Sequence, residues 1–510
     1  MLGSGKYSHN TRQRRKRKIL FAIISVALIL SLTSCSTGKK QPVGNTPESS
    51  RPPASENQGA ENTKPSSTGS TVNDIPLSPE ITEDIENEPQ FTPASEFDYK
   101  DYEDGIMIVR YNGDLPDVRV PDMIDGKPVV KIDNEAFSSN EEITTVIISA
   151  NVTEVGYWAF SACKNLKEVT IPDSVAKLGF GVFWYCTSLE YVSMGNSVTS
   201  FTDSLFMDCT SLRSITIPDS VTEIWGTAFE GCTALTNVTI PKSVETISEG
   251  AFSIAGGDLY EINIDEDNEK YSSVDGVLFN KDKTILLMYP PGKPQDSYAI
   301  PDGVKTVARN AFLNHRWLTS VTIPESVTSI DDGALNTKNG NISEISVDAG
   351  NGVYSSVDGV LFSKDKTVLV SYPSGRQQES YTIPSYVSTI KGAEWQSSAS
   401  RTYTGGAFGY CGALLEVSIP NSVTSIGKFA FYGCSGLTEV TIPNSVKHIN
   451  ESVFSHCTGL TSVTMSDSIE SVYINAFYEC RNIANVYYKG QTFRGWNNFL
   501  DTALGNWSKY

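Results

Sequence analysis

Apolar residues recur along the chain in a pattern that repeats about every 23 residues, with the unit L-x-x-V-x-I-P-x-S-V-x-x-I-G-x-x-A-F-x-x-C. Its L-x-x-V-x-I part alternates apolar and polar positions, which predicts a short strand with Val and Ile inward and Thr or Ser outward. The following Pro cannot donate a backbone hydrogen bond and ends the strand. The Gly permits a turn, and the Ala-Phe pair returns a bulky side chain to the interior. Each unit therefore predicts one rung of a repeat solenoid.

The repeat accounts for about fourteen rungs. One rung cannot bury its apolar side alone, so neighbouring rungs must stack in register. With strands ~4.8 Å apart, the stack predicts a mainly β, right-handed curved rod on the order of 70 Å long, with short turns or helical loops. The last apolar strand residue of each rung is Ile148, Ile171, Met194, Ile217, Ile240, Ile264, Ile300, Ile323, Val347, Ile383, Ile419, Ile442, Met465 and Tyr488.

Three of these units are 36 residues long, and two of them contain the same nine residues. YSSVDGVLF occupies positions 271–279 and 354–362, followed by NKDKTILLMYP and SKDKTVLVSYP. A polar turn between two apolar segments predicts a β-hairpin that either projects from the rung or widens it. The two hairpin modules span about residues 265–300 and 348–383. The third long unit, with GAEWQSSASRTYTGGAFGYC, lacks this pattern and predicts a flexible Ser/Thr loop.

The acidic run DEDNE at residues 265–269 raises the alternative of a calcium-binding loop. The second copy has DAGNG at this place, and the ligand spacing of an EF-hand is absent from both. A structural module is therefore favoured over a metal-binding or catalytic loop.

The first 96 residues differ in composition from the rest. RRKRK precedes an apolar run at residues 19–32, and LTSC ends at Cys35. The run is too short for a membrane span, which needs ~20 residues, but suits a secretory signal. LTSC resembles the lipobox of bacterial lipoproteins, which implies lipid attachment at Cys35; an ordinary signal peptide with a chance cysteine, or an uncleaved anchor, are the alternatives. The high content of Ser, Thr, Pro and Glu in residues 36–96 predicts that this segment is a disordered linker.

Net charge and motif content narrow the function classes. The chain carries 59 acidic and 40 basic residues, for a net charge of −19, which disfavours binding to nucleic acid. It has no nucleophile elbow, phosphate-binding Gly loop or HExxH, so neither an enzyme nor a cofactor is expected. His315, His448 and His456 are interpreted as surface or packing residues rather than metal ligands.

Eight cysteines occupy one position of the repeat. They are Cys163, Cys186, Cys209, Cys232, Cys411, Cys434, Cys457 and Cys480. Stacked rungs would keep their Cβ atoms ~4.8 Å apart, beyond the usual disulfide range, which favours buried free thiols over bridges and over a metal site. Ala255 and Lys338 interrupt this ladder before the hairpin modules, and His315 stands at the ladder position itself.

Bulky aromatic residues stand at variable turn positions of the early rungs. The x position between Val and Ile in the strands of these rungs carries Thr170, Ser193, Thr216 and Thr239, a row of hydroxyl groups that is typical of a solvated sheet face. Stacking should gather several aromatic rings into an exposed binding patch, although they could instead pack between loops or against the N-terminal segment. The candidate residues are Tyr157, Trp158, Phe180, Trp184, Tyr185 and Trp225.

The 23-residue unit resembles the leucine-rich repeats of the BspA-like (Treponema-type) family. Residues 97–142 are similar to that family's N-terminal cap and first repeat, residues 143–488 to its repeats, and residues 489–510 to its closing segment. The resemblance implies a bacterial cell-surface lipoprotein that binds a protein or glycoprotein outside the cell, as in adhesion. The alternative is a structural or glycan-binding protein of the cell envelope. The sequence does not predict the oligomeric state.

Overall fold

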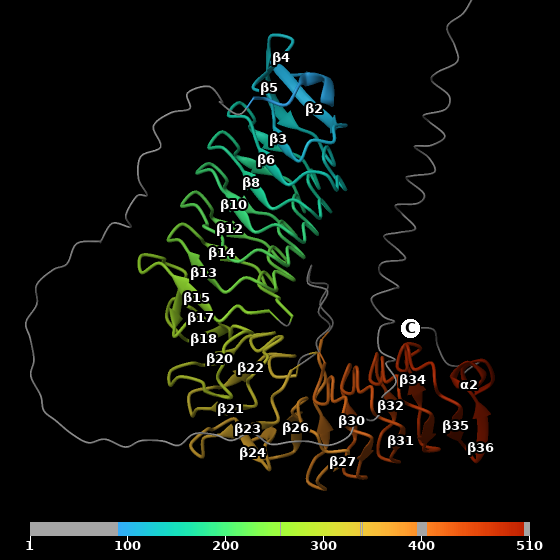
Figure 1. The fold of residues 1–510 in the computed structure, drawn as a ribbon. Coiled ribbons are helices and arrows are strands. Elements are labelled where there is room, and N and C mark those ends of the chain that lie inside the picture. Colours follow the sequence, from blue (N-terminus) through green and yellow to red (C-terminus); the bar gives the residue numbers. More distant parts are fainter. Residues whose placement is uncertain (1–89, 256, 337, 339, 395–404, 504–510) are drawn as a thin grey trace, which may run out of the picture. The chain divides into compact units, whose positions relative to one another are not determined.

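The computed structural model describes residues 90–255, 257–336, 338, 340–394 and 405–503. The predicted signal, Cys35 and the linker up to residue 89 lie outside these residues, as does most of the predicted Ser/Thr loop. The described part is a solenoid of stacked rungs with two hairpin modules, which confirms the predicted fold class (Figure 1).

The predicted strands form the first of two parallel rows, in which neighbouring rungs pair at the repeat spacing in runs of two to four strands. Val169 of β8 lies opposite Val192 of β10, for example. β3, one rung before the first predicted one, already belongs to this row. Residues 214–217 contribute one isolated bridge, Thr216 to Thr239. The strands are β3 (Asp117–Arg119), β6 (Thr145–Ile147), β8 (Glu168–Thr170), β10 (Tyr191–Ser193), β13 (Asn237–Ile240), β15 (Glu261–Ile264), β19 (Ser297–Ala299), β21 (Ser320–Ile323), β23 (Glu344–Val347), β27 (Ser380–Thr382), β29 (Glu416–Ser418), β31 (Glu439–Ile442), β33 (Ser462–Met465) and β35 (Asn485–Tyr488).

The second row, which the sequence pattern did not predict, is formed mostly by two-residue strands at the V-x-x-I segment of each unit. Nearly all of these strands bury an apolar residue, such as Val155 or Ile224, while Ile247 is half-buried. Neighbouring strands pair in parallel within runs of two or three rungs. The strands are β5 (Lys127–Ile132), β7 (Glu154–Val155), β9 (Lys177–Leu178), β11 (Ser200–Phe201), β12 (Glu223–Ile224), β14 (Thr246–Ile247), β18 (Ile285–Met288), β20 (Thr306–Val307), β22 (Ser329–Ile330), β26 (Val368–Ser371), β28 (Thr389–Ile390), β30 (Ser425–Ile426), β32 (His448–Ile449) and β34 (Ser471–Val472).

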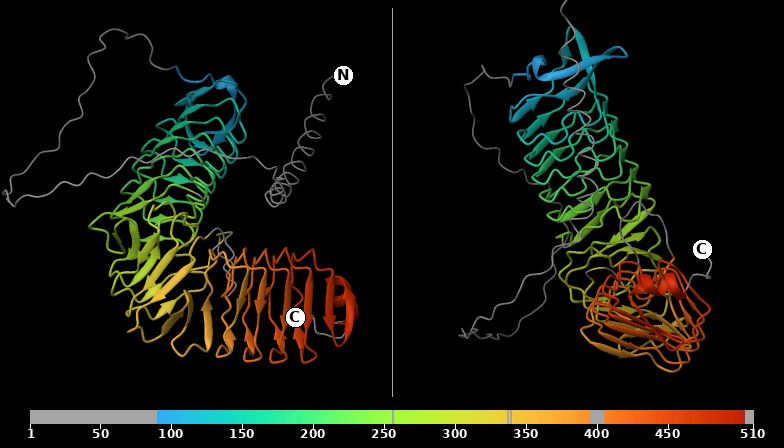
Figure 2. Two further views of the ribbon diagram at one scale, coloured as in Figure 1. Left: turned by 60° about the horizontal axis from the view of Figure 1, so that its bottom comes forward. Right: turned by 90° about the vertical axis from the view of Figure 1, so that its right-hand side faces the viewer.

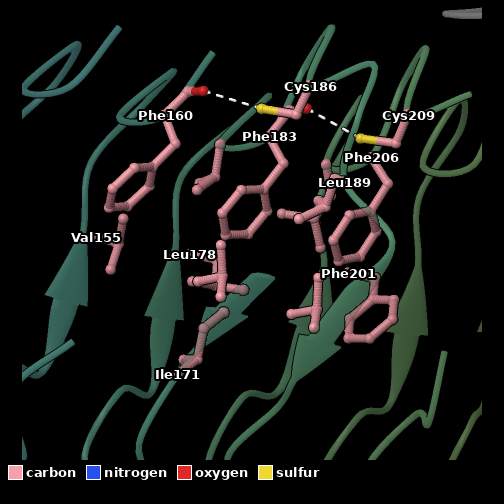
Figure 3. Close-up of a cluster of buried hydrophobic side chains, with 14 of the residues drawn as sticks. Val155, Phe160, Ile171, Leu178, Phe183, Cys186, Leu189, Phe201, Phe206 and Cys209 are labelled. Atoms are coloured by element: carbon pink, nitrogen blue, oxygen red, sulfur yellow. Dashed lines mark hydrogen bonds between the residues drawn. The ribbon is translucent and has the colours of Figure 1, made fainter. Parts of the chain in front are cut away.

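The repeat phenylalanines stack along the interior. The rings of Phe160 and Phe183 are 5.7 Å apart and nearly parallel, and those of Phe183 and Phe206 are 5.6 Å apart (Figure 3). All three side chains are fully buried. Because the stacked face of each ring is covered by the next rung, the phenylalanine column locks the register of the rungs.

Both ends of the column are covered. β1 (Phe97–Tyr102) and β2 (Gly105–Tyr111) form an antiparallel pair, β4 (Met123–Ile124) pairs with β5, and Tyr111 stacks on Phe137 at 5.4 Å. A single 3-10 turn, η1 (Ala94–Glu96), precedes β1. At the other end, β36 (Gln491–Arg494) pairs with β35, and Trp496 of α2 (Trp496–Ala503) lies 4.3 Å from Phe477. Figure 2 shows α2 beside the last strands.

Each hairpin module is a three-stranded meander. In the first, β16 (Tyr271–Val274) and β17 (Val277–Asn280) are antiparallel, and β17 pairs with β18, the predicted hairpin. β18 then takes the place of a second-row strand by pairing in parallel with β20. The second module repeats this order with β24 (Tyr354–Val357), β25 (Val360–Ser363) and β26. The modules are thus rungs in their own right.

The central strands of the modules separate neighbouring parts of the core. In β17, Leu278 packs into the cluster of the preceding rungs, whereas Val277 and Phe279 pack into the cluster that follows. In β25, Leu361 faces backward, while Val360 and Phe362 face forward. We call β17 and β25 the septum strands. Since both of their faces are buried, the modules widen the stack rather than project from it.

A buried asparagine starts each module. Asn268 is fully buried and donates to the carbonyls of Pro241 (2.9 Å) and Val244 (3.0 Å), while its Oδ1 accepts the N–H groups of Lys270 and Tyr271. Asn351 makes the equivalent four bonds in the second module. DEDNE and DAGNG share this asparagine and the aspartate three residues before it, whose carbonyl accepts the N–H of the asparagine and whose Oδ1 accepts the N–H two residues on. Both shared residues therefore have a structural role in each copy.

Candidate binding surface

The predicted aromatic residues lie on the turns that connect the second strand row to the cysteine position. We call these turns, at residues 133–139, 156–162, 179–185, 202–208 and 225–231, the N-terminal turn edge. Each turn contains a left-handed residue just after its start, with Glu135 at φ 57°, Ser204 at 56° and Thr227 at 60°. Such positions favour Gly, Asn or small polar residues because a bulky side chain there is strained.

Two of the candidate residues occupy left-handed positions. Trp158 has φ 54°, and Tyr185, at a second left-handed position near the end of the turn, has φ 62°. Large side chains in this conformation cost on the order of 1 kcal/mol or more and are often associated with function. Their presence indicates that these side chains serve a purpose other than the turn conformation.

Three of the candidate rings contact one another. The rings of Tyr157 and Trp158 are 6.3 Å apart, and Trp158 meets Phe180 of the next rung edge to face at 5.4 Å. Tyr157 is 53% exposed and Trp158 38%, whereas Phe180 is half-buried. The structure therefore brings these three together in a partly exposed cluster.

The other three candidates are placed differently. A Cβ atom at Gly181 would lie 2.7 Å from Cδ1 of Trp158 and 3.6 Å from Cβ of Trp184, so Trp184 adjoins the cluster. Trp184 and Tyr185 are half-buried, and the indole N–H of Trp184 is buried without a hydrogen-bond partner among the described residues. Trp225, 49% exposed, makes no ring contact in the described part and donates instead to Glu223. The six residues do not form one continuous patch.

Sequence reasoning missed a second group of aromatic residues on the turns of the C-terminal rungs. His456 lies between Tyr432 and Tyr478, at 4.9 and 5.7 Å, and Tyr432 also contacts Phe429. Phe429 and Tyr432 are buried, whereas Tyr478 is exposed. The sequence did contain a signal for this second group, because its residues occupy the same positions of the repeat as the N-terminal candidates.

The cysteine ladder is buried, and all eight thiols are free. Cys186 Sγ donates to the carbonyl of Phe160 in the preceding rung at 3.0 Å, and Cys209 donates to Phe183 at 3.1 Å (Figure 3). Burial raises the pKa of Cys163 to about 12. Each thiol thus serves as a small apolar residue that also donates a hydrogen bond to a buried carbonyl. A disulfide would remove this hydrogen bond, because its sulfur atoms carry no hydrogen. The interrupting residues Ala255 and Lys338 are exposed.

His315 occupies the ladder position in a rung that lacks the cysteine. It is 1% exposed, and neither ring nitrogen has a hydrogen-bond partner among the described residues. Burial lowers its pKa to about 4, because the charged imidazolium would lose its hydration. The other two histidines lie nearer the surface, where His448 pairs with Ser471 and His456 with Ser455.

We expect His315 to make the protein less stable in mild acid. The native side chain stays neutral while the unfolded one binds a proton below pH ~6.5, so stability falls as pH drops from 6.5 toward 4, by at most about 3 kcal/mol. His315→Cys, which restores the ladder residue, should reduce the difference in unfolding free energy between pH 7 and pH 4.5. His448→Gln is the control and should leave that difference unchanged. An unaltered pH dependence in His315→Cys would contradict the assignment.

Comparison with known protein families identifies the repeat. The family described as BspA type leucine-rich repeat region matches residues 130–257, 293–368 and 402–506 in six copies. No curated protein matches the sequence significantly.

The described part of the chain lacks any helix of the length and apolarity that crossing a membrane requires.

Three of the solved structures that are similar to the chain come from bacteria. The chain is 25% identical to a leucine-rich cell surface protein of Faecalibacterium prausnitzii, over 79% of this chain and 96% of that one, with a TM-score of 0.42. It is 32% identical to a leucine-rich repeat protein of T. pallidum over 34% and 81% of the chains, with a TM-score of 0.33. The pneumococcal vaccine antigen PcpA is 18% identical over 82% and 96%, with a TM-score of 0.43.

Proposed function

Because the chain belongs to the BspA-type leucine-rich repeat family, we propose that it is a bacterial cell-surface protein that binds a protein or glycoprotein outside the cell. Stacked rungs offer an extended surface on which side chains repeat at regular intervals, which suits recognition of a partner. We propose that its contribution to the cell is adhesion and that it needs no cofactor.

The observation that carries this proposal is the cluster of Tyr157, Trp158 and Phe180. These rings are partly exposed, contact one another across two rungs, and include a tryptophan in a strained backbone conformation. Tyr and Trp provide large rigid contact areas at low entropic cost and are common anchors of protein interfaces. The sheet face of the same rungs carries mostly hydroxyl side chains such as Thr170 and Ser193, and its exposed ring, Tyr191, makes no ring contact in the described part of the chain.

We expect Tyr157→Ala combined with Trp158→Ser to weaken partner binding at least tenfold, since loss of one central anchor costs ~2 kcal/mol or more. Serine is the residue that Ser204 provides at the equivalent left-handed position, so thermal unfolding should hardly change. Trp184 is left intact because it is half-buried. Binding of the full chain is measured to purified extracellular-matrix proteins, to cell wall from the bacterium that makes it, and to further copies of the same protein.

The matched control is Tyr191→Ala, which removes an aromatic ring of 53% exposure from the sheet face of β10. Equal binding by both variants would show that the cluster is not the site. Binding to the cell wall or to itself alone, with no matrix protein retained, would support the alternative of a structural envelope protein.

We also propose that Cys35 anchors the chain to the membrane through a lipid. The basic cluster, the short apolar run and LTSC support this. Cys35→Ser is expected to release the protein from membranes or to block its maturation, as measured by cell fractionation and by the mass of the N-terminal peptide. Unchanged membrane retention with residues 1–34 still attached would favour an uncleaved anchor.

A further inference from the structure

We propose that the N-terminal turn edge binds a lysine- and arginine-bearing segment of the partner protein. This inference rests on the proposed function and adds the chemistry of the ligand. Its basis is that carboxylates flank the aromatic residues in consecutive rungs, while the turns contain no basic residue.

The first line of side chains follows the left-handed positions near the start of each turn. Glu135 N–H donates to the carbonyl of Tyr157, Trp158 N–H to that of Phe180, and Gly181 N–H to that of Asp203. These bonds place the residues in four successive rungs, ~4.8 Å apart. The exposed cluster therefore has Glu135 one rung before it and Asp203 one rung after it.

The second line follows the end of each turn and has the same character. Tyr185 N–H donates to the carbonyl of Met207, and Asp208 N–H donates to that of Glu230. The half-buried aromatic pair of Trp184 and Tyr185 is thus followed by an acidic residue in each of the next two rungs. In both lines an aromatic residue is followed by an acidic residue in the next rung. The carboxylates therefore form a repeated arrangement with the aromatic rings and not an isolated acidic cluster.

Basic residues are absent from the five turns of the N-terminal turn edge. Two lysines that flank these turns in the sequence are paired, Lys131 with Glu154 at 2.5 Å and Lys164 with Glu141 at 3.7 Å. Lys177 of β9, two residues before the third turn, is exposed and forms no ion pair in the described part of the chain. Neither Glu135 nor Asp203 forms an ion pair in the described part of the chain. Among the equivalent turns of later rungs, those at residues 308–314 and 427–433 carry Arg309 and Lys428, whereas those at 248–254, 450–456 and 473–479 each carry one glutamate and no Lys or Arg. The N-terminal turn edge is where turns without Lys or Arg follow one another over five consecutive rungs.

Together these groups match a cationic side chain that lies over an aromatic face and ends at a carboxylate. A guanidinium or ammonium group over Trp or Tyr gains ~0.5–1 kcal/mol at an exposed site, and a nearby carboxylate adds to the attraction. From Glu135 to Asp203 is about three rung spacings, or ~15 Å, which an extended chain covers in four to five residues. A neutral glycan would use the rings but would gain nothing from the uniform negative sign.

The test measures binding of the full chain to three probes by quenching of tryptophan fluorescence. The probes are a lysine- and arginine-rich peptide, a glutamate-rich peptide of the same length, and a neutral chitin-derived oligosaccharide. We expect only the basic peptide to bind, with an affinity that falls as salt is raised. Trp158→Ser should weaken this binding about fivefold, the equivalent of ~1 kcal/mol.

Matched variants distinguish binding of the peptide at the N-terminal turn edge from its non-specific attraction to the net negative charge of the protein. Glu135→Gln with Asp203→Asn removes two charges at the edge, and Glu416→Gln with Glu439→Gln removes two from the sheet face of β29 and β31. The inference requires the first pair to weaken peptide binding several-fold more than the second. Equal effects would reduce it to non-specific attraction and overturn it.

The outcomes also distinguish this inference from the proposed function. If the oligosaccharide bound in a Trp158-dependent way and the basic peptide did not, the ligand chemistry would be wrong while the edge would remain a binding site. If Trp158→Ser changed neither probe binding nor matrix-protein binding, both proposals would fall.

Discussion

Replacing Asn268 by leucine is expected to lower the free energy of unfolding by about 3 kcal/mol or more. Leucine has nearly the same size but leaves two carbonyls and two N–H groups of the buried chain without the bonds that the amide provides. Each buried polar group without a partner costs ~1–3 kcal/mol. Asn351→Leu should have an effect of similar size, because the second module repeats all four bonds.

The measurement is denaturant unfolding followed by circular dichroism, with Asn196→Leu as the control. Asn196 is exposed in a turn, and its side chain makes no hydrogen bond in the described structure, so the control should change stability by less than ~0.5 kcal/mol. Similar small effects at Asn268 and Asn196 would contradict the role assigned to the buried amide.

Truncating Phe183 to alanine is expected to lower the free energy of unfolding by about 3–5 kcal/mol, the usual cost of losing a buried aromatic ring. The ring is fully buried between Phe160 and Phe206, so its removal leaves a cavity in the middle of the column. The rungs cannot close this cavity, because their backbone hydrogen bonds hold them at a fixed spacing.

The same unfolding experiment on Tyr191→Ala provides the comparison. This ring is exposed on the sheet face, and its loss should cost less than ~0.5 kcal/mol. A loss below ~1 kcal/mol for Phe183→Ala would show that the column is loosely packed. Hydrogen exchange should in that case reveal weak protection in the rungs around it.

The repeat period made the stacking predictable from the sequence. A spacing of 23 residues places Val169 opposite Val192 and the cysteines in one column, and the structure has both. The second strand row was missed because two-residue strands carry too little alternation to produce a pattern. They form only because neighbouring rungs present the same two residues side by side.

The modules show where sequence reasoning stopped short. The hairpin at NKDK was predicted, but the turn at Asp275-Gly276 was not, although the Asp-Gly dipeptide is a strong signal for a tight hairpin turn. Both residues have positive φ, at 48° and 72°. The buried role of Asn268 had no signal in one copy alone, since its four partners lie on two different rungs.

The aromatic surface was only partly predictable. The residues could be named because they stand at variable positions, but their placement depends on the turn backbone. Trp158 is turned outward by a left-handed conformation, and Gly181 leaves the space that its ring fills. Neither condition can be read from composition or period. Trp225 is separated from the cluster by the turn at residues 202–208, whose aromatic residue, Phe206, is buried in the phenylalanine column.

The septum strands bear on how the length of such a chain can change during evolution. The side chains of β17 and β25 meet the rungs before and after them with separate faces, so the apolar core of each block of rungs packs against a wall. Polar contacts at the turns still join neighbouring blocks, since Asn310 donates to Glu249 and Asn336 donates to the carbonyl of Ala407. A rung gained or lost by recombination between repeats away from these contacts therefore alters the apolar packing of its own block only. Selection can then adjust the reach of one block while the turn edge of another keeps its side chains in place.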